Sequence, residues 1–178
     1  LSMRMRGMEG PRIYAIAAPA PSVFPSGPRF IGVLTLQTRF PRLPGDIGNP
    51  ASFGVPTLTR VVRGVRPHDA VQSAAGQRAA GLLEPFADAL RSLERSGAAS
   101  ITTSCGFLVL MQPQLQALTR LPVVTSSLML LPQLLERSKR VGVLTVSARH
   151  LEADFFQMAG VPATRLEDLV VEGVDPDG

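Results

Sequence analysis

Apolar residues along the chain occur either in continuous runs or at helical spacing. Residues 30–37 form a continuous apolar run, which is typical of a parallel strand covered on both faces. Residues 57–65 carry β-branched side chains at a density that predicts a second strand. A helix that ends at Gly97 is predicted next, because apolar side chains recur there on one helical face: Leu82, Leu83, Phe86, Leu90 and Leu93.

The second half of the chain repeats this alternation. Three further short strands are predicted, over residues 98–102, 121–125 and 140–145. A helix is predicted over residues 107–118. A second helix is capped by Ser126 and Ser127, with Pro132 in its first turn or at a kink. A third helix runs from an N-cap at Ser147 to Gly160. Residues 163–171 predict a sixth strand or the linker into one. Strands alternating with helices indicate βαβ units, so we predict an α/β fold with a parallel, doubly wound sheet flanked by helices.

Three parts of the chain differ in composition. Residues 1–28 are rich in Met, Pro, Ala and Gly and predict a flexible N-terminal extension, in which residues 13–18 are a candidate edge strand. Residues 29–171 predict the α/β domain, and residues 172–178 predict a disordered tail. The apolar piece of the extension is short and interrupted by prolines, so we interpret it as a leader or extension and expect a cytoplasmic protein.

Two polar segments separate the predicted elements of the first half. Residues 38–50 are rich in Pro and Gly and follow the carboxyl end of the first strand, where ligands bind in open α/β sheets. A solvent-facing connection is the alternative for this segment, with Arg42 and Asp46 pairing to order it. Residues 66–76 are polar and predict a loop.

The single cysteine, Cys105, lies where a predicted strand ends and a predicted helix begins. The N–H groups and partial positive charge of a helix N-terminus favour anions, and a thiol placed there tends to have a lowered pKa. Small polar neighbours leave room for a bound carboxylate. The alternative is an inert buried thiol, because free cysteines are among the most buried residues.

Composition excludes several classes of function. The 178 residues carry a net charge of +4, but the arginines are scattered, so we expect no nucleic-acid binding. One cysteine excludes a disulfide framework and a cysteine-cluster metal site, and the two histidines match no ligand spacing, so we expect no metal. No apolar run reaches the length of about 18 residues that a membrane span needs, so we expect no membrane partner.

With these segments placed, the chain resembles the aspartate/glutamate/hydantoin racemase superfamily. The resemblance covers residues 30–170 and is carried, in family order, by four stretches: 31–34 with the loop 39–50, the Thr-Ser-Cys-Gly-Phe turn at 103–107, Pro-Val-Val-Thr-Ser-Ser at 122–127, and Lys-Arg-Val-Gly-Val-Leu-Thr at 139–145. It implies two similar α/β lobes with the active site between them. It also implies cofactor-independent acid/base chemistry at the α-carbon of an amino acid or a related small carboxylate, with one cysteine from each lobe.

Matched by position, Cys105 is the first-lobe cysteine and the expected catalytic residue. The resemblance places Ser104, Gly106 and Phe107 beside it, where their backbone N–H groups and the Ser104 hydroxyl would hold the substrate carboxylate. The substrate-contacting residues at strand ends would be Gln37, Thr38, Ser126, Thr145 and Ser147. Capping alone is the alternative for Ser147, and His150 is interpreted as a helix-surface residue.

The chain departs from the superfamily at the second cysteine, which it lacks. The matched region ends before that position, so we expect an incomplete second lobe, whose uncovered apolar surface favours self-association, for example as a homodimer. Arylmalonate decarboxylases, superfamily members with one cysteine, carry it in the other lobe. Three hypotheses therefore stay open: a racemase-like isomerase, a one-cysteine lyase or isomerase of the same fold, and a catalytically inactive binding or scaffold protein.

Overall fold

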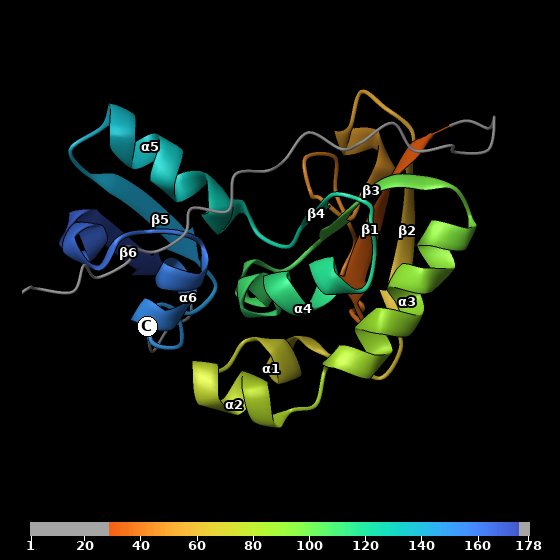
Figure 1. Ribbon diagram of the computed structural model, residues 1–178, viewed down its shortest axis with the longest axis horizontal. Coiled ribbons are helices and arrows are strands. Elements are labelled where there is room, and N and C mark those ends of the chain that lie inside the picture. The colour runs from red at the N-terminus through yellow and green to blue at the C-terminus, as the bar shows by residue number, and fades with distance from the viewer. Residues whose placement is uncertain (1–28, 175–178) are drawn as a thin grey trace, which may run out of the picture.

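The computed structural model describes residues 29–174, which form two lobes (Figure 1). The first lobe holds a four-stranded, all-parallel sheet in the order β2-β1-β3-β4, and the second holds a two-stranded parallel sheet of β5 and β6. The predicted α/β class with parallel strands flanked by helices is confirmed. The predicted extension, its edge strand and residues 175–178 of the tail lie outside the described residues. The strands are β1 (Phe30–Leu36), β2 (Thr57–Val62), β3 (Ala98–Thr103), β4 (Val123–Val124), β5 (Val141–Thr145) and β6 (Leu169–Gly173).

Short helices connect these strands, including two in a segment that the sequence predicted to be a loop. Helices α1 and α2 begin at capped positions: Asp69 accepts the N–H of Arg66 at 2.7 Å, and the Ser73 hydroxyl accepts the N–H of Gly76 at 3.2 Å. The loop prediction for residues 66–76 was wrong because these caps satisfy helix ends within a polar stretch. The α-helices are α1 (Pro67–Ala70), α2 (Ala74–Ala79), α3 (Leu83–Arg95), α4 (Gln112–Ala117), α5 (Leu131–Arg137) and α6 (Ala153–Met158), and the 3-10 helices are η1 (Pro50–Ser52), η2 (Gly106–Met111), η3 (Ser127–Leu130) and η4 (Ala163–Asp168).

Helix α3 is the amphipathic helix that the apolar spacing predicted. Phe86, Leu90 and Leu93 are each 0% exposed, and the helix packs against β1, β2 and β3. Burying a side chain of this size contributes about 1.5–3 kcal/mol, so this face fixes the helix on the sheet. Gly97, at φ 94°, ends the helix as expected.

Prolines divide two of the predicted helices. A continuous helix over 107–118 would place Pro113 in its interior, where it has no N–H to donate to the preceding turn. The chain instead forms η2 and then α4, with Pro113 in the first turn of α4. Pro132 likewise lies in the first turn of α5, as predicted, after η3.

The carboxyl end of the described chain also differs in detail from the prediction. Residues 163–168 form η4, so the sixth strand is short, and β6 pairs in parallel with β5. The last residue pair between these two strands joins Gly173 to Thr145. Strand β6 therefore includes residues 172 and 173, which the sequence assigned to the tail.

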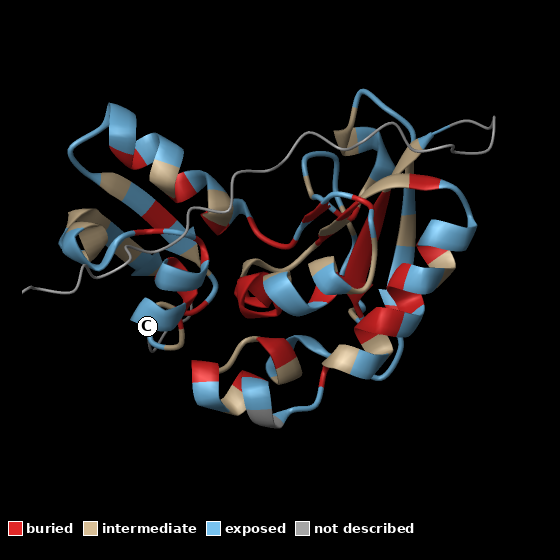
Figure 2. Cartoon of the chain, in the orientation of Figure 1, coloured by how far each residue is buried: buried red, intermediate tan, exposed pale blue. Residues whose placement is uncertain are grey.

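Two apolar clusters make up the core, and they meet near Cys105. One lies among the four-stranded sheet, α3, η2 and α4, and the other lies among η2, α5, α6 and β5 (Figure 2). The rings of Phe107 and Phe155 meet edge to face, with centroids 5.2 Å apart and an interplanar angle of 72°, and so join η2 to α6. Cys105 packs against both clusters and therefore sits at the junction of the two lobes.

Candidate active site

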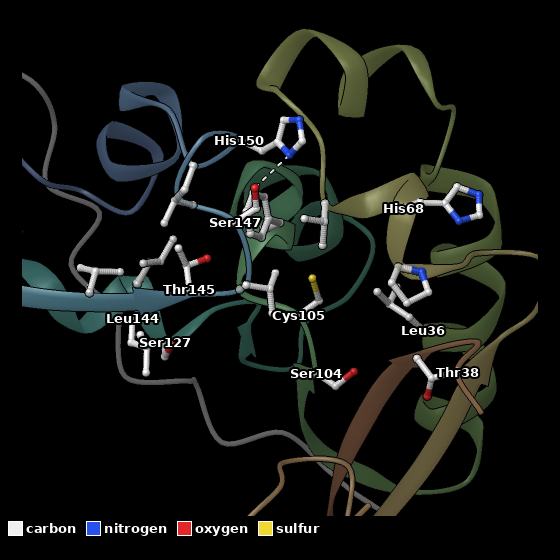
Figure 3. Close-up of a pocket in the computed structure, with 18 of the residues that line it drawn as sticks. Leu36, Thr38, His68, Ser104, Cys105, Ser127, Leu144, Thr145, Ser147 and His150 are labelled. Carbon is white, nitrogen blue, oxygen red and sulfur yellow. Dashed lines mark hydrogen bonds between the residues drawn. The ribbon is translucent and has the colours of Figure 1, made fainter. Parts of the chain in front are cut away.

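A cavity of about 630 Å³ opens between the lobes at the carboxyl ends of β1, β3 and β5. The sheet order reverses direction between β1 and β3, and ligands in open α/β sheets bind at such a switch point. Figure 3 shows side chains from both lobes around this space. The lining residues are Leu36, Thr38, Phe40, Arg42, Pro67, His68, Val71, Ser104, Cys105, Gly106, Phe107, Ser127, Leu128, Val143, Leu144, Thr145, Val146, Ser147, His150 and Leu151.

Cys105 is half-buried at the start of η2, and its sulfur points into the cavity (Figure 3). Burial raises the pKa of the Cys105 thiol, although the backbone N–H groups of Phe107 and Leu108 act in the opposite direction. The prediction that the helix start lowers the pKa of Cys105 was therefore wrong. The apolar packing of both clusters around the thiol disfavours the thiolate more than the first turn of a short 3-10 helix favours it.

The residues beside Cys105 differ in what they offer to a ligand. Ser104, Gly106 and Phe107 all line the cavity. The N–H of Ser104, however, donates to the carbonyl of Leu34 at 3.0 Å and so belongs to the sheet. Its expected role as a backbone donor to substrate was wrong, although Ser104 itself lies on the cavity wall.

The two residues that follow β1, Gln37 and Thr38, lie in different surroundings. Thr38 lines the cavity, and its hydroxyl accepts the Nη2 group of Arg42 at 3.1 Å. Gln37 is exposed and is not among the lining residues, and its amide oxygen accepts the N–H of Gly64 at 2.9 Å. The hydrogen bond of Gln37 therefore orders the turn after β2.

The long loop after β1 is held by its own side chains and forms part of the wall. Arg42 and Asp46 form an ion pair at 3.1 Å, and Asn49 donates to the carbonyl of Arg42 at 2.6 Å. The Arg42 guanidinium also lies 4.5 Å from the centre of the Phe40 ring. Phe40 and Arg42 both line the cavity, so the loop supplies one aromatic face and one cation.

Ser126 and Thr145 were the residues expected to contact substrate from the ends of β4 and β5. Ser126 is buried and accepts the N–H of Leu128 at 3.1 Å, which caps η3, and it is absent from the lining. Its neighbour Ser127 lines the cavity instead, together with Thr145.

Ser147 and His150 form a pair on the second lobe. Ser147 does not cap the next helix, since α6 begins at Ala153 with Glu152 as its N-cap. Its hydroxyl oxygen instead lies 3.1 Å from Nδ1 of His150, and both residues line the cavity. The interpretation of His150 as a helix-surface residue was therefore wrong, because the chain turns at this point before α6 begins.

His68 also reaches the cavity, from α1, a segment in which the sequence predicted only a loop. No spacing or periodicity in the sequence indicates this placement, which depends on how α1 packs beside the sheet. Within residues 29–174, no cluster of His, Cys, Asp and Glu has the composition to hold a metal ion. In that part of the chain no helix is both long and apolar enough to cross a membrane.

Fold and cavity together define a two-lobed α/β protein with a cysteine on the wall between its lobes. No protein-family model matches the chain. Its structural neighbours include an aspartate racemase homologue from Pyrococcus horikoshii, with a TM-score of 0.47 and 17% identity over 82% of this chain and 65% of that one. Another is a liganded mutant of arylmalonate decarboxylase, with a TM-score of 0.44 and 20% identity over 82% of this chain and 60% of that one.

In sequence, the chain is similar to proteins named dimethylsulfoniopropionate lyase. It is 38% identical to one from Durusdinium sp. clade D over 105 residues, which are 58% of this chain and 34% of that protein. It is 32% identical to dimethylsulfoniopropionate lyase 7 of Emiliania huxleyi over 149 residues, which are 83% of this chain and 40% of that protein. The matched part of the chain therefore spans well under half of each of these relatives.

Proposed function

We propose that this chain forms part of a carbon–sulfur lyase acting on dimethylsulfoniopropionate, with Cys105 as the catalytic base. One observation carries the proposal: the single cysteine lines a cavity at the switch point between β1 and β3. The sequence similarity to proteins named as lyases of this substrate supports the choice of reaction and substrate.

The proposed reaction is an elimination. The substrate has a carboxylate, an α-carbon beside it, and a dimethylsulfonium group on the next carbon. The Cys105 thiolate takes a proton from the α-carbon, and the electron pair of that C–H bond forms a carbon–carbon double bond. The C–S bond breaks with its electron pair going to sulfur. The products are acrylate, dimethyl sulfide and a neutral thiol, which returns its proton to water.

One cysteine suits this reaction better than the racemase-like isomerase reaction. Inverting a carbon requires a base on one face and an acid on the other. In an elimination the electron pair departs with the leaving group, so no second acid is required at carbon. The chain has one cysteine, which favours the one-cysteine lyase among the hypotheses raised by the sequence. The reaction needs no cofactor, and we keep a cytoplasmic location and a homodimer as parts of the proposal.

The raised pKa of Cys105 is compatible with this chemistry. A thiolate with a high pKa is scarce before substrate binds, but it is a strong base once formed. The described lining contains no Asp or Glu, so no other anion there competes for the sulfonium of the substrate. An opposite charge within about 4–6 Å favours the ionised form, so the bound sulfonium would oppose the effect of burial. We therefore expect kcat/KM to rise with pH above neutrality.

The test is to incubate the purified chain with dimethylsulfoniopropionate and to measure dimethyl sulfide by headspace gas chromatography and acrylate by liquid chromatography. We expect both products in equal amounts, and a loss of at least about 100-fold in Cys105→Ser, since removal of a general base typically costs that much. Ser96→Ala lies outside the cavity lining and serves as the matched control. Circular dichroism checks that each variant is folded.

Two results would reject the lyase. Exchange of the α-proton of amino acids with solvent deuterium, without release of sulfide, would indicate the racemase-like isomerase. Neither exchange nor elimination would indicate the binding or scaffold protein.

A further inference from the structure

The Ser147–His150 pair lies on the second-lobe wall of the cavity that Cys105 lines (Figure 3). Ser147 is 3% exposed and His150 is half-buried, so the pair is built into the wall. The hydrogen bond between Ser147 Oγ and His150 Nδ1 measures 3.1 Å. A hydroxyl has one proton to donate, so the direction of this bond decides what Ser147 presents to a ligand.

The bond has two forms, which differ in where the protons lie. When Nδ1 of His150 carries no proton, the Ser147 hydroxyl donates to it and turns only lone pairs toward other partners. When Nδ1 carries a proton, it donates to Ser147 Oγ, and the hydroxyl proton is free to point into the cavity. A carboxylate accepts hydrogen bonds only, so it selects the second form.

The charges around the cavity distinguish His150 from the other basic residues of the lining. Arg42 is paired with Asp46 at 3.1 Å, and Nε2 of His68 lies 3.3 Å from a carboxylate oxygen of Asp69. Among the ion pairs of residues 29–174, none involves His150. Of the basic side chains in the described lining, His150 is thus the one with a neutral hydroxyl as a partner and no ion pair to a carboxylate.

We propose that Ser147 binds the substrate carboxylate through its hydroxyl, and that His150 is the positioning residue that directs this hydroxyl into the cavity. The inference rests on the proposed function for the identity of the substrate. It assigns the second lobe a role in binding, opposite to the base supplied by the first lobe, and it requires no second cysteine.

The test measures binding of a zwitterion that matches the substrate in shape, 3-(trimethylammonio)propionate, by isothermal titration calorimetry. The matched ligand is its primary amide, which keeps the cation and lacks the carboxylate. We expect Ser147→Ala to weaken binding of the carboxylate at least about tenfold, because a hydrogen bond to a charged group contributes about 1.5–3 kcal/mol. Binding of the amide should weaken clearly less, because its carbonyl accepts only a neutral hydrogen bond.

Variants at position 150 separate positioning from a structural role. His150→Phe removes the donor but leaves the Ser147 hydroxyl, so it should weaken carboxylate binding by less than Ser147→Ala does, and the double variant should be little worse than Ser147→Ala alone. His150→Asn keeps a donor near the place of Nδ1 and should recover most of the affinity. A merely structural role of His150 would lower the melting temperature and weaken both ligands equally.

Three results of the binding experiment would overturn the inference. They are no measurable binding of the zwitterion to the unaltered chain, equal loss for carboxylate and amide, and full affinity in His150→Phe. Binding is measured without turnover, so a chain that binds the zwitterion through this pair but releases no dimethyl sulfide would reject the proposed function and leave this inference standing. Sulfide release with an unchanged KM in both single variants would reject this inference and leave the proposed function standing.

Discussion

The contact between Phe107 and Phe155 gives a direct test of how the two lobes are held together. Phe155 is 0% exposed on α6, and its ring meets that of Phe107 edge to face at 5.2 Å. Truncation to alanine would cost about 3–5 kcal/mol, which is much of the stability of a typical domain, so the milder change Phe155→Leu is the better probe. It keeps most of the apolar volume and removes the ring.

We expect Phe155→Leu to lower the free energy of unfolding by about 1–2 kcal/mol, because an aromatic pair contributes about 0.5–1.5 kcal/mol beyond its buried area. The chain has no Trp and one Tyr, so urea unfolding is followed by far-ultraviolet circular dichroism rather than by fluorescence. A double-mutant cycle with Phe107→Leu should give a coupling energy of about 0.5–1.5 kcal/mol.

Phe156 offers the matched control for this cycle. It is 6% exposed on the same helix, and within residues 29–174 the edge-to-face ring contact joins Phe107 to Phe155 and not to Phe156. Phe156→Leu should lose a similar amount of stability but show no coupling to Phe107→Leu. A coupling below about 0.3 kcal/mol for the Phe155 cycle, which is the usual error of additivity, would refute the reasoning. Equal coupling for Phe155 and Phe156 would refute it as well.

Three further predictions follow from single contacts. Because burial raises the pKa of Cys105, iodoacetamide at pH 7 should alkylate it more slowly than free N-acetylcysteine, and faster labelling would contradict the raised pKa. For the same reason the free energy of unfolding should fall as pH rises from the ordinary pKa range of a thiol through the pKa of Cys105 in the folded chain. Gly32→Ala places a methyl group 2.8 Å from Ile101 Cδ1 and 2.9 Å from Leu93 Cδ1, so it should lower the free energy of unfolding by about 1–3 kcal/mol. Urea titration measures this loss, and an unchanged unfolding midpoint would show that the two side chains move aside freely. The Gln77 amide donates to the carbonyls of Ala70 at 2.8 Å and Phe107 at 2.9 Å. Gln77→Glu should therefore lower the melting temperature more at pH 8 than at pH 4, where a protonated carboxyl still donates, and equal losses at the two pH values would refute this prediction.

Local patterns in the sequence predicted those elements whose formation depends on local spacing. The apolar face of α3 and the buried run of β1 are properties of consecutive residues, and both elements form where predicted. The proline at position 132 likewise acts on its own turn and was placed correctly. The helix over 107–118 failed for the same local reason, since the effect of Pro113 on that turn was not weighed.

Properties that depend on packing between distant segments were not predictable in this way. The pKa of Cys105 follows from apolar side chains of both clusters, whereas the sequence shows only the adjoining turn. His68 and His150 reach one cavity from segments about 80 residues apart, and neither carries a local signal of that placement. Ser126 and Ser127 are adjacent and chemically alike, yet one caps η3 and the other lines the cavity.

The strand-end rule nevertheless located residues of both walls, although the strands belong to two sheets. Thr38 and Cys105 follow β1 and β3 of the first sheet, and Thr145 and Ser147 lie at the end of β5 in the second. The rule holds within one sheet because parallel strands bring their carboxyl ends to the same edge. It extends across the lobes here because the second apolar cluster, through Phe107 and Phe155, sets the end of β5 against the turn at Cys105. A change that loosens this packing should therefore separate the proposed base from the proposed carboxylate site without altering either one.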